Sequence, residues 1–175
     1  CLTCPIGKYS EDTASFCEDC AIGYYNPSTK QAKCSACDAG YVQPKTAQAS
    51  CNACLAGTYQ NLDASAKCVT CADGSASGKG AANCAQCTAG RYMHTSRTSC
   101  TACASGDVSI IGSTECTTCK AGTYAASDAS ACISCPKGKY QIKAGQLQCS
   151  DCASGYFSAS GAATCTACPA GEYSN

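Results

Sequence analysis

The sequence predicts a small disulfide-rich fold, an elongated rod of about eleven disulfide-closed loops of 16 or 17 residues with short irregular β-hairpins and little or no helix. Three observations predict it. Cysteine supplies 22 of the 175 residues, the cysteines fall into evenly spaced C-x-x-C pairs, and large apolar residues are scarce. A chain this rich in cysteine is expected to be held together by sulfur rather than by an apolar core.

Large apolar residues are too few for an ordinary core. Leu, Ile, Val and Phe contribute 4, 6, 3 and 2 residues, 15 in all. That is about 9% of the chain, whereas chains below roughly 20% do not usually bury a core. The hydrophobic content of 45% is raised by cysteine and alanine, and buried alanine gains little free energy. We therefore expect disulfides to replace the missing core.

Charge and hydropathy exclude several partners. Twelve basic and twelve acidic residues cancel and are scattered along the chain, so we expect no nucleic-acid partner and no membrane contact within this segment. No apolar stretch approaches the roughly 20 residues that cross a bilayer. Disulfides persist mainly in oxidising compartments. Because the chain opens on Cys1 and shows no signal peptide, we expect a fragment of a longer extracellular protein, either secreted or at the cell surface.

A repeat runs through the whole chain. Eleven C-x-x-C pairs follow one another at steps of 16 or 17 residues, which predicts one tandem-repeat domain over residues 1–175. We number the repeats 1 to 11. They begin at Cys1, Cys17, Cys34, Cys51, Cys68, Cys84, Cys100, Cys116, Cys132, Cys149 and Cys165.

A glycine follows each second cysteine at the third position, and we call it the motif glycine. Only glycine easily tolerates a positive φ or a close approach of the backbone to a disulfide, so we expect a structural turn there. The motif glycines are Gly7, Gly23, Gly40, Gly57, Gly74, Gly90, Gly106, Gly122, Gly138, Gly155 and Gly171.

An aromatic residue stands two positions after the motif glycine in eight repeats. We expect it to pack against the disulfide and the next glycine turn. Val42 and Val108 occupy two other repeats, and the repeat with Ala76 is expected to pack most loosely. The remaining segments are rich in turn residues, so each repeat should form a short hairpin of strands about three residues long. The packing aromatics are Tyr9, Tyr25, Tyr59, Tyr92, Tyr124, Tyr140, Phe157 and Tyr173.

The C-x-x-C pairs could in principle hold a metal, haem or a redox-active dithiol. The spacing C-x2-C-x12-C-x2-C is found in zinc ribbons, but zinc would use the pairs two at a time and eleven pairs cannot be divided so. Covalent haem requires a histidine directly after the second cysteine, and none of the pairs has one. A redox dithiol requires a helix N-terminus, which nothing here predicts. We expect no cofactor, no metal and no catalytic residue.

Structural disulfides remain, and repetition limits how they can pair. Joining the second cysteine of each pair to the first of the next closes loops of about 14 residues, each worth on the order of 3 kcal/mol. An alternating scheme, first to third and second to fourth, also fits locally. The first scheme leaves Cys1 and Cys168 over and predicts Cys4–Cys17, Cys20–Cys34, Cys37–Cys51, Cys54–Cys68, Cys71–Cys84, Cys87–Cys100, Cys103–Cys116, Cys119–Cys132, Cys135–Cys149 and Cys152–Cys165.

The motif C-x-x-C-x-x-G-x-Y, as in CISCPKGKY and CTACPAGEY, resembles tandem ephrin-receptor-like cysteine-rich repeats. It is also similar to the one-disulfide modules of tumour-necrosis-factor-receptor ectodomains. The resemblance covers essentially the whole chain. It implies disulfide-closed modules with little regular secondary structure, stacked into an extracellular rod, and the first pairing scheme matches those modules. It implies no particular ligand.

Three functions fit these features. The first is a non-enzymatic structural protein of the cell exterior, a disulfide-linked shaft, stalk or filament component. The second is a ligand-binding or adhesive ectodomain of a cell-surface receptor, and the third is a microbial cysteine-rich variable surface antigen. The expected partners are proteins, through self-association or other surface-fibre proteins, and O-glycans on turn Ser and Thr residues are a further expectation from composition.

Overall fold

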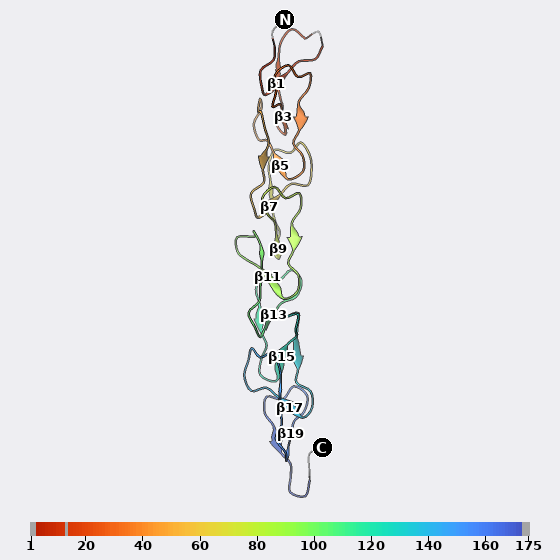
Figure 1. Ribbon diagram of the computed structural model, residues 1–175, viewed down its shortest axis with the longest axis vertical. Coiled ribbons are helices and arrows are strands. Elements are labelled where there is room, and N and C mark those ends of the chain that lie inside the picture. Colours follow the sequence, from red (N-terminus) through yellow and green to blue (C-terminus); the bar gives the residue numbers. More distant parts are fainter. Residues whose placement is uncertain (1–2, 13, 173–175) are drawn as a thin grey trace. The chain divides into compact units, whose positions relative to one another are not determined.

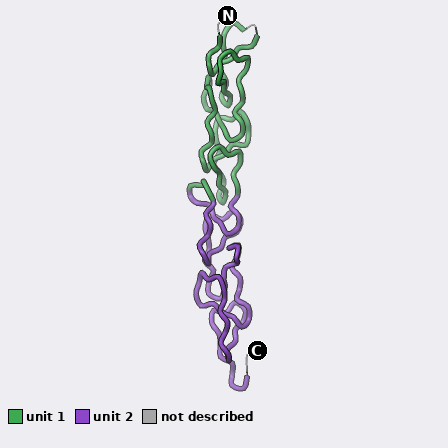
Figure 2. The backbone as a smooth tube through the Cα atoms, in the orientation of Figure 1, with its two compact units in different colours: residues 1–85, 96–99 green, residues 86–95, 100–175 purple. Residues whose placement is uncertain are grey.

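The computed structural model describes residues 3–12 and 14–172. The chain divides into two compact units (Figure 2): unit 1 contains residues 1–85 and 96–99, and unit 2 contains residues 86–95 and 100–175. None of the described residues lies in a helix, and the strands pair in two-stranded sheets of consecutive strands. The predicted fold class, small disulfide-closed repeats with short hairpins, is confirmed.

Unit 1 contains the first nine strands, and the tenth strand, β10 (Ala85–Gln86), spans the unit boundary. All of them are two residues long, and Figure 1 draws them one after another along the unit. They are β1 (Lys8–Tyr9), β2 (Glu18–Asp19), β3 (Tyr24–Tyr25), β4 (Ser35–Ala36), β5 (Tyr41–Val42), β6 (Asn52–Ala53), β7 (Thr58–Tyr59), β8 (Val69–Thr70) and β9 (Ser75–Ala76).

Unit 2 contains the remaining strands, and four of them are three residues long. They are β11 (Arg91–Met93), β12 (Cys100–Ala102), β13 (Asp107–Val108), β14 (Thr117–Thr118), β15 (Thr123–Ala125), β16 (Cys132–Ser134), β17 (Lys139–Tyr140), β18 (Ser150–Asp151), β19 (Tyr156–Phe157) and β20 (Thr166–Ala167).

Each hairpin is built from two parts of the motif. Its first strand follows the motif glycine, and its second strand contains the two residues between the cysteines of the next pair. In the first hairpin, Lys8 lies opposite Asp19 and Tyr9 opposite Glu18, and the Cys20 N–H donates to the Gly7 carbonyl at 2.9 Å. Most strands are shorter than the expected three residues because the glycine turn and the cysteines bound the ladder on both sides.

Ten disulfides close the loops, with Cα–Cα distances from 5.4 to 5.8 Å. Each joins the second cysteine of one pair to the first of the next, and no described disulfide follows the alternating scheme. The pairs are Cys4–Cys17, Cys20–Cys34, Cys37–Cys51, Cys54–Cys68, Cys71–Cys84, Cys87–Cys100, Cys103–Cys116, Cys119–Cys132, Cys135–Cys149 and Cys152–Cys165.

The sulfur atoms occupy the place of a core. Among the residues that bury their side chains almost completely, seven of the eight largest are cysteines, each the second of its pair. Large aliphatic residues such as Leu55 and Ile110 are instead exposed. The disulfide line is therefore the interior of each unit, as the shortage of large apolar residues predicts.

Candidate functional site: the contacts between repeats

Contacts between successive repeats recur in register with the motif. The N–H of a motif glycine donates to a carbonyl in the following repeat, and this acceptor is always the residue three positions after the next motif glycine. We call that residue the G+3 position. The donor and acceptor pairs, at 2.7 to 3.2 Å, are Gly7 to Asn26, Gly23 to Gln43, Gly40 to Gln60, Gly57 to Ser77, Gly90 to Ser109, Gly122 to Gln141 and Gly138 to Ser158.

The motif glycine also meets the repeat after next. A Cβ on Gly40, where φ is +88°, would lie 2.2 Å from the Gly80 carbonyl oxygen, and one on Gly122 would lie 2.1 Å from that of Gly161. No side chain fits at such distances, so glycine is required at these positions both for the positive φ and for the close approach of the backbone. At Gly138 and Gly155, a Cβ would meet nothing within 4 Å.

The approaching segment contains a second left-handed position, present in each of repeats 2 to 10, which sequence reasoning missed. We call it the turn residue. Its φ is positive at Lys30, Ala47, Ala64, Gly80, Arg97, Gly112, Ala129, Gly145 and Gly161. Glycine stands at only four of these nine positions, so no single residue type marked the turn in the sequence.

Seven of the nine turn residues are hydrogen-bonded to the preceding repeat. Their N–H donates to the carbonyl of that repeat's second cysteine at 2.7 to 3.1 Å, as from Gly80 to Cys54 and from Gly145 to Cys119, whereas the Ala129 N–H donates to Ala126 of its own turn. At Arg97 the guanidinium donates to the Cys71 carbonyl at 2.6 Å and pairs with Asp73 at 2.8 Å. In repeats 1 to 3, for example, hydrogen bonds link each repeat to the next one and the glycine contact links it to the one after.

The G+3 position carries a buried side chain, and sequence reasoning missed this as well. A visible signal existed, since a polar residue follows the aromatic in most repeats. Seven of the nine buried members are polar, and none of the described buried side-chain N or O atoms lacks a hydrogen-bond partner. The buried G+3 residues are Asn26, Gln43, Gln60, Ser77, Met93, Ser109, Ala125, Gln141 and Ser158.

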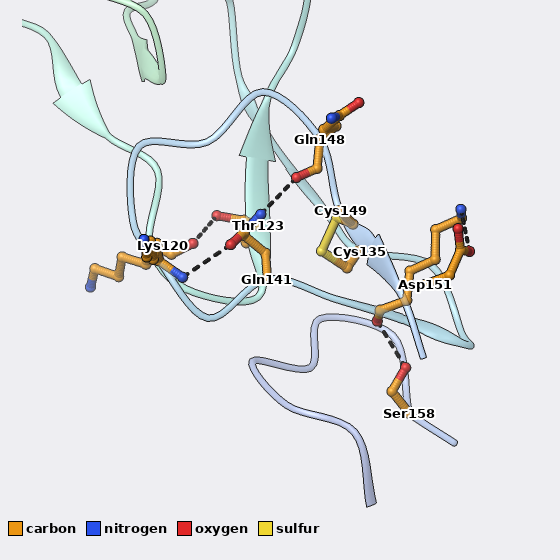
Figure 3. Close-up of a disulfide and its surroundings, with 10 residues drawn as sticks. Lys120, Thr123, Cys135, Gln141, Gln148, Cys149, Asp151 and Ser158 are labelled. Carbon is orange, nitrogen blue, oxygen red and sulfur yellow. Dashed lines mark hydrogen bonds and ion pairs between the residues drawn. A yellow bond between two sulfur atoms is a disulfide. The ribbon is translucent and has the colours of Figure 1, made fainter. Parts of the chain in front are cut away.

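A glutamine at G+3 closes the loop of its own repeat. In Figure 3, the Gln141 amide donates to the Gln148 carbonyl at 2.8 Å, next to the disulfide between Cys135 and Cys149. Its oxygen accepts the N–H of Lys143 at 3.1 Å. Gln43 and Gln60 make the same two bonds, to the residues two and seven positions later.

A serine at G+3 bonds instead to the preceding repeat. The hydroxyls of Ser77, Ser109 and Ser158 donate at 2.8 to 2.9 Å to a carbonyl of the preceding repeat. The acceptor is the residue that directly follows the motif glycine of that repeat. Asn26 combines both arrangements. Its amide donates to the Lys8 carbonyl at 2.8 Å, and its oxygen accepts the N–H of Ser28 at 3.2 Å.

An apolar residue at G+3 goes with a longer hairpin. Met93 lies opposite Cys100, and Ala125 lies opposite Cys132, so β11, β12, β15 and β16 each extend to three residues. The additional residue pair of the hairpin lies where, in other repeats, a glutamine side chain closes the loop. Side-chain and backbone bonding thus substitute for each other at one place in the repeat.

The predicted packing aromatics lie at the edge of the interior rather than within it. Tyr9, Tyr25, Tyr59, Tyr92, Tyr124 and Tyr140 are half-buried, Phe157 is 48% exposed, and Tyr173 lies outside the described residues. Val42, Ala76 and Val108 are buried at the equivalent positions. Ala76 is thus buried in the structure, whereas the sequence predicts the loosest packing in its repeat.

Two ionisable groups have pKa values displaced by local hydrogen bonds. The Tyr9 hydroxyl donates to the Glu18 carboxylate at 2.8 Å, and this bond and the negative charge raise the pKa of Tyr9. The hydroxyl and N–H of Ser130 both donate to Asp128 and lower the pKa of its carboxyl. Both groups lie on the surface and stabilise local turns or hairpins.

The described residues contain no group of three or more His, Cys, Asp or Glu side chains arranged to hold a metal ion. The Cys168 thiol is free and half-buried, and Cys1 lies outside the described residues. No helix in the described part of the chain is long and apolar enough to span a membrane.

A family model described as tyrosine-protein kinase ephrin type A/B receptor-like matches residues 7–47 and 122–155. No curated protein matches the chain. The two matched segments contain the same C-x-x-C, motif glycine and disulfide arrangement that recurs in the intervening repeats. The matched segments and the ten disulfides fit cysteine-rich repeats of the ephrin-receptor-like kind.

Proposed function

We propose that this chain of ephrin-receptor-like cysteine-rich repeats is a non-enzymatic structural element of the cell exterior, a shaft that holds whatever it carries at a fixed distance. The disulfide-rich repeats suit an extracellular ectodomain, because disulfides persist in oxidising compartments. The family match and the fold both favour a non-catalytic ectodomain. The finer role, a shaft, is our own inference.

The observation that carries the proposal is the packing of a motif glycine against the turn residue two repeats later. Gly7, Gly23 and Gly40 each make this contact in unit 1, and Gly106 and Gly122 make it in unit 2. A joint fixed by the disulfide alone could still bend. Contacts that reach beyond the nearest neighbour oppose bending, because tilting one repeat must break its hydrogen bonds to the next repeat and its close packing against the one after.

Small-angle X-ray scattering of the full chain tests the proposal. A compact 175-residue domain has a radius of gyration of about 16 Å and an unfolded chain one of about 44 Å. A shaft that advances about 10 Å per repeat, three extended residues at roughly 3.3 Å each, is on the order of 110 Å long and gives about 32 Å. A value near 16 Å contradicts the shaft.

A shortened variant separates a stiff shaft from a flexible string. Deleting residues 34–50 removes one repeat and lets Cys20 pair with Cys51 in the same scheme. We expect the maximum dimension to fall by about 10 Å, one repeat's advance. A flexible string would change less, because its dimensions grow with about the square root of its length.

A further inference from the structure

Two pockets in unit 1 are built alike from successive repeats. The first, which we call the Tyr24 pocket, is formed by repeats 1 and 2 and is lined by Tyr9, Glu11, Asp19, Tyr24 and Lys33. The second, the Tyr41 pocket, is formed by repeats 2 and 3 and is lined by Tyr25, Asp38, Tyr41 and Ser50. We propose that each pocket binds one sugar ring of a neutral, glucose-type polysaccharide. The proposal is independent of the shaft function.

Each pocket takes two tyrosines from consecutive repeats. One stands at the aromatic position of the earlier repeat, and the other directly follows the motif glycine of the next. The Tyr24 pocket has Tyr9 and Tyr24, and the Tyr41 pocket has Tyr25 and Tyr41. Tyr24 and Tyr41 are 37% and 42% exposed. The fold does not require a tyrosine after the motif glycine, because Thr58 forms the same hairpin at that position.

Each pocket also contains a hydrogen-bond acceptor and a donor. The acceptors are the exposed carboxylates of Glu11 and Asp38, and no ion pair in the described part of the chain involves either. The donors are the Lys33 ammonium group and the Ser50 hydroxyl, which stand at the same position of their repeats, directly before the next cysteine. Flat tyrosine surface is thus combined with groups that bond to a polar ligand.

The charges favour a neutral ligand that carries hydroxyl groups. In the Tyr24 pocket, Glu11 and Asp19 are balanced by Lys33 and by Lys8, which pairs with Asp19 at 2.7 Å. A cationic ligand would meet the Lys33 ammonium group, and an anionic ligand would meet the Glu11 carboxylate. A purely apolar ligand would desolvate both charges without bonding to them. A hydroxyl group both donates and accepts, so it can bond to either.

A glucose-type ring matches this combination. Its hydroxyl groups are all equatorial, so both faces of the ring expose only C–H groups while the hydroxyls project from the edge. Two apolar faces are then available to two tyrosines, and the edge is available to the carboxylate. The pocket volumes, about 300 and 380 Å³, lie at the low end of the roughly 300 to 1,000 Å³ of small-molecule sites, as expected for a single ring.

A third tyrosine pair in unit 2 lacks the acceptor. Tyr140 and Tyr156 stand at the equivalent positions of repeats 9 and 10, and Tyr156 is 46% exposed. Ile142 and Ala153 occupy the positions that carry the unpaired carboxylates in unit 1, and Asp151 is held in an ion pair. We expect no binding at this pair, so it serves as an internal control.

Nuclear magnetic resonance of the nitrogen-15-labelled full chain, titrated with cellotetraose over about 0.1 to 20 mM, measures each site by its backbone amide shifts. One ring of about a dozen non-hydrogen atoms supports a dissociation constant on the order of 1 mM. The amide signals of Tyr24 and Tyr41 should shift accordingly, and that of Tyr156 should not. β-1,4-Galactotetraose, whose axial hydroxyl spoils one C–H face, should bind at least threefold more weakly. Choline chloride should cause no shift.

Single substitutions separate the two pockets. Tyr24→Ala should abolish the shifts around the Tyr24 pocket and leave those around Tyr41 unchanged, and Tyr41→Ala should do the reverse. Asp38→Asn keeps the size of an exposed side chain and should weaken binding at the Tyr41 pocket at least threefold. Tyr156→Ala is the matched control, at the same motif position and with similar exposure, and should leave both pockets unchanged.

Mass mapping of the ten disulfides and a thermal melt of every variant show whether the fold is retained. Four outcomes would each overturn the proposal: no shift with cellotetraose at 20 mM, equal binding of galactotetraose, weakening by Tyr156→Ala equal to that by Tyr24→Ala, or binding of choline in place of the sugar.

Discussion

Repeats 2 to 4 in unit 1 and repeats 7 and 8 in unit 2 close the same kind of loop by different means. The former are 17 residues long and carry Asn26, Gln43 and Gln60 at G+3, and the latter are 16 residues long and carry Ser109 and Ala125. The correlation extends over repeats 1 to 10: an amide side chain stands at G+3 in every 17-residue repeat and in none of the 16-residue repeats.

The difference shows that the type of residue at G+3 correlates with the length of the loop. The longer loop leaves room that a glutamine amide fills with two hydrogen bonds, to residues two and seven positions later. In the shorter loop a serine bonds backwards and a glycine makes the turn three residues later, or an apolar residue lengthens the hairpin. All these solutions keep the turn residue in place for the glycine two repeats earlier, so the joint is preserved although the loop varies.

The largest effect is expected where both loop classes depend on the same contact. Gly40→Ala and Gly122→Ala should each cost at least about 3 kcal/mol in unfolding free energy, because a methyl group would collide with a backbone carbonyl. Loop length should not matter, since Gly40 belongs to a 17-residue repeat and Gly122 to a 16-residue repeat. Urea denaturation monitored by tyrosine fluorescence measures the loss.

Gly138→Ala is the matched control for this prediction. Its φ of +78° is as unfavourable for alanine as that of Gly122, but the added Cβ would meet nothing within 4 Å. The expected loss is about 1 kcal/mol, the cost of the left-handed conformation alone. Equal losses at Gly122 and Gly138 would show that the contact between alternate repeats contributes nothing.

A smaller effect should separate the glutamine loops from the rest. Gln60→Ala removes two hydrogen bonds from a buried site and should cost about 2 kcal/mol, near 1 kcal/mol for each bond. The comparison variant is Gln31→Ala, because the Gln31 side chain is exposed and makes one long bond to Thr29 at 3.4 Å. Thermal unfolding of the two variants distinguishes them, and similar melting temperatures would contradict the role of the G+3 amide.

The serine repeats should respond more weakly. Ser109→Ala removes one bond, from the hydroxyl to the Arg91 carbonyl at 2.9 Å, and should cost about 1 kcal/mol. Because this bond joins repeats 6 and 7, the change should also speed amide hydrogen exchange at Gly90, whose N–H donates to the Ser109 carbonyl. Ser127→Ala, at an exposed position, provides the baseline, and exchange at Gly90 that matches this baseline would be evidence against the bond.

The sequence was most informative where one residue type is required. Cysteine spacing and the invariant glycine predicted the fold class, since no other residue forms a disulfide and few tolerate a positive φ. The turn residue escaped detection because alanine, lysine and arginine occupy it at Ala47, Lys30 and Arg97, where contacts with other repeats enforce an unfavourable conformation. Such contacts are properties of the assembled chain and leave no local pattern.

Residue size misled the expectation of where side chains are buried. The aromatic position is large and apolar, yet the structure leaves most of its members half-exposed and buries the smaller polar residue next to it. At G+3, the serine hydroxyls bond to the preceding repeat and the glutamine amides bond within their own loop. A polar residue is buried there because its hydrogen-bonding groups all find partners.

The smallest effect is expected from exchanging a complete loop. Residues 43–50 (QPKTAQAS) and 77–83 (SGKGAAN) both connect a buried position to the first cysteine of the next pair. Their turn residues also match, since the Ala47 N–H donates to Cys20 and the Gly80 N–H donates to Cys54. Replacing the first loop by the second should therefore leave the melting temperature almost unchanged, because the shorter loop brings its own serine and glycine.

A mismatched variant shows whether the pairing of residue and length is causal. The same replacement with glutamine in place of its first serine, QGKGAAN, puts an amide into a loop that lacks the space for it. Burying that amide without partners should cost about 1 to 3 kcal/mol, and the melting temperature should fall relative to the SGKGAAN variant. If the two variants melt together, the correlation between G+3 and repeat length does not reflect the packing of the loop.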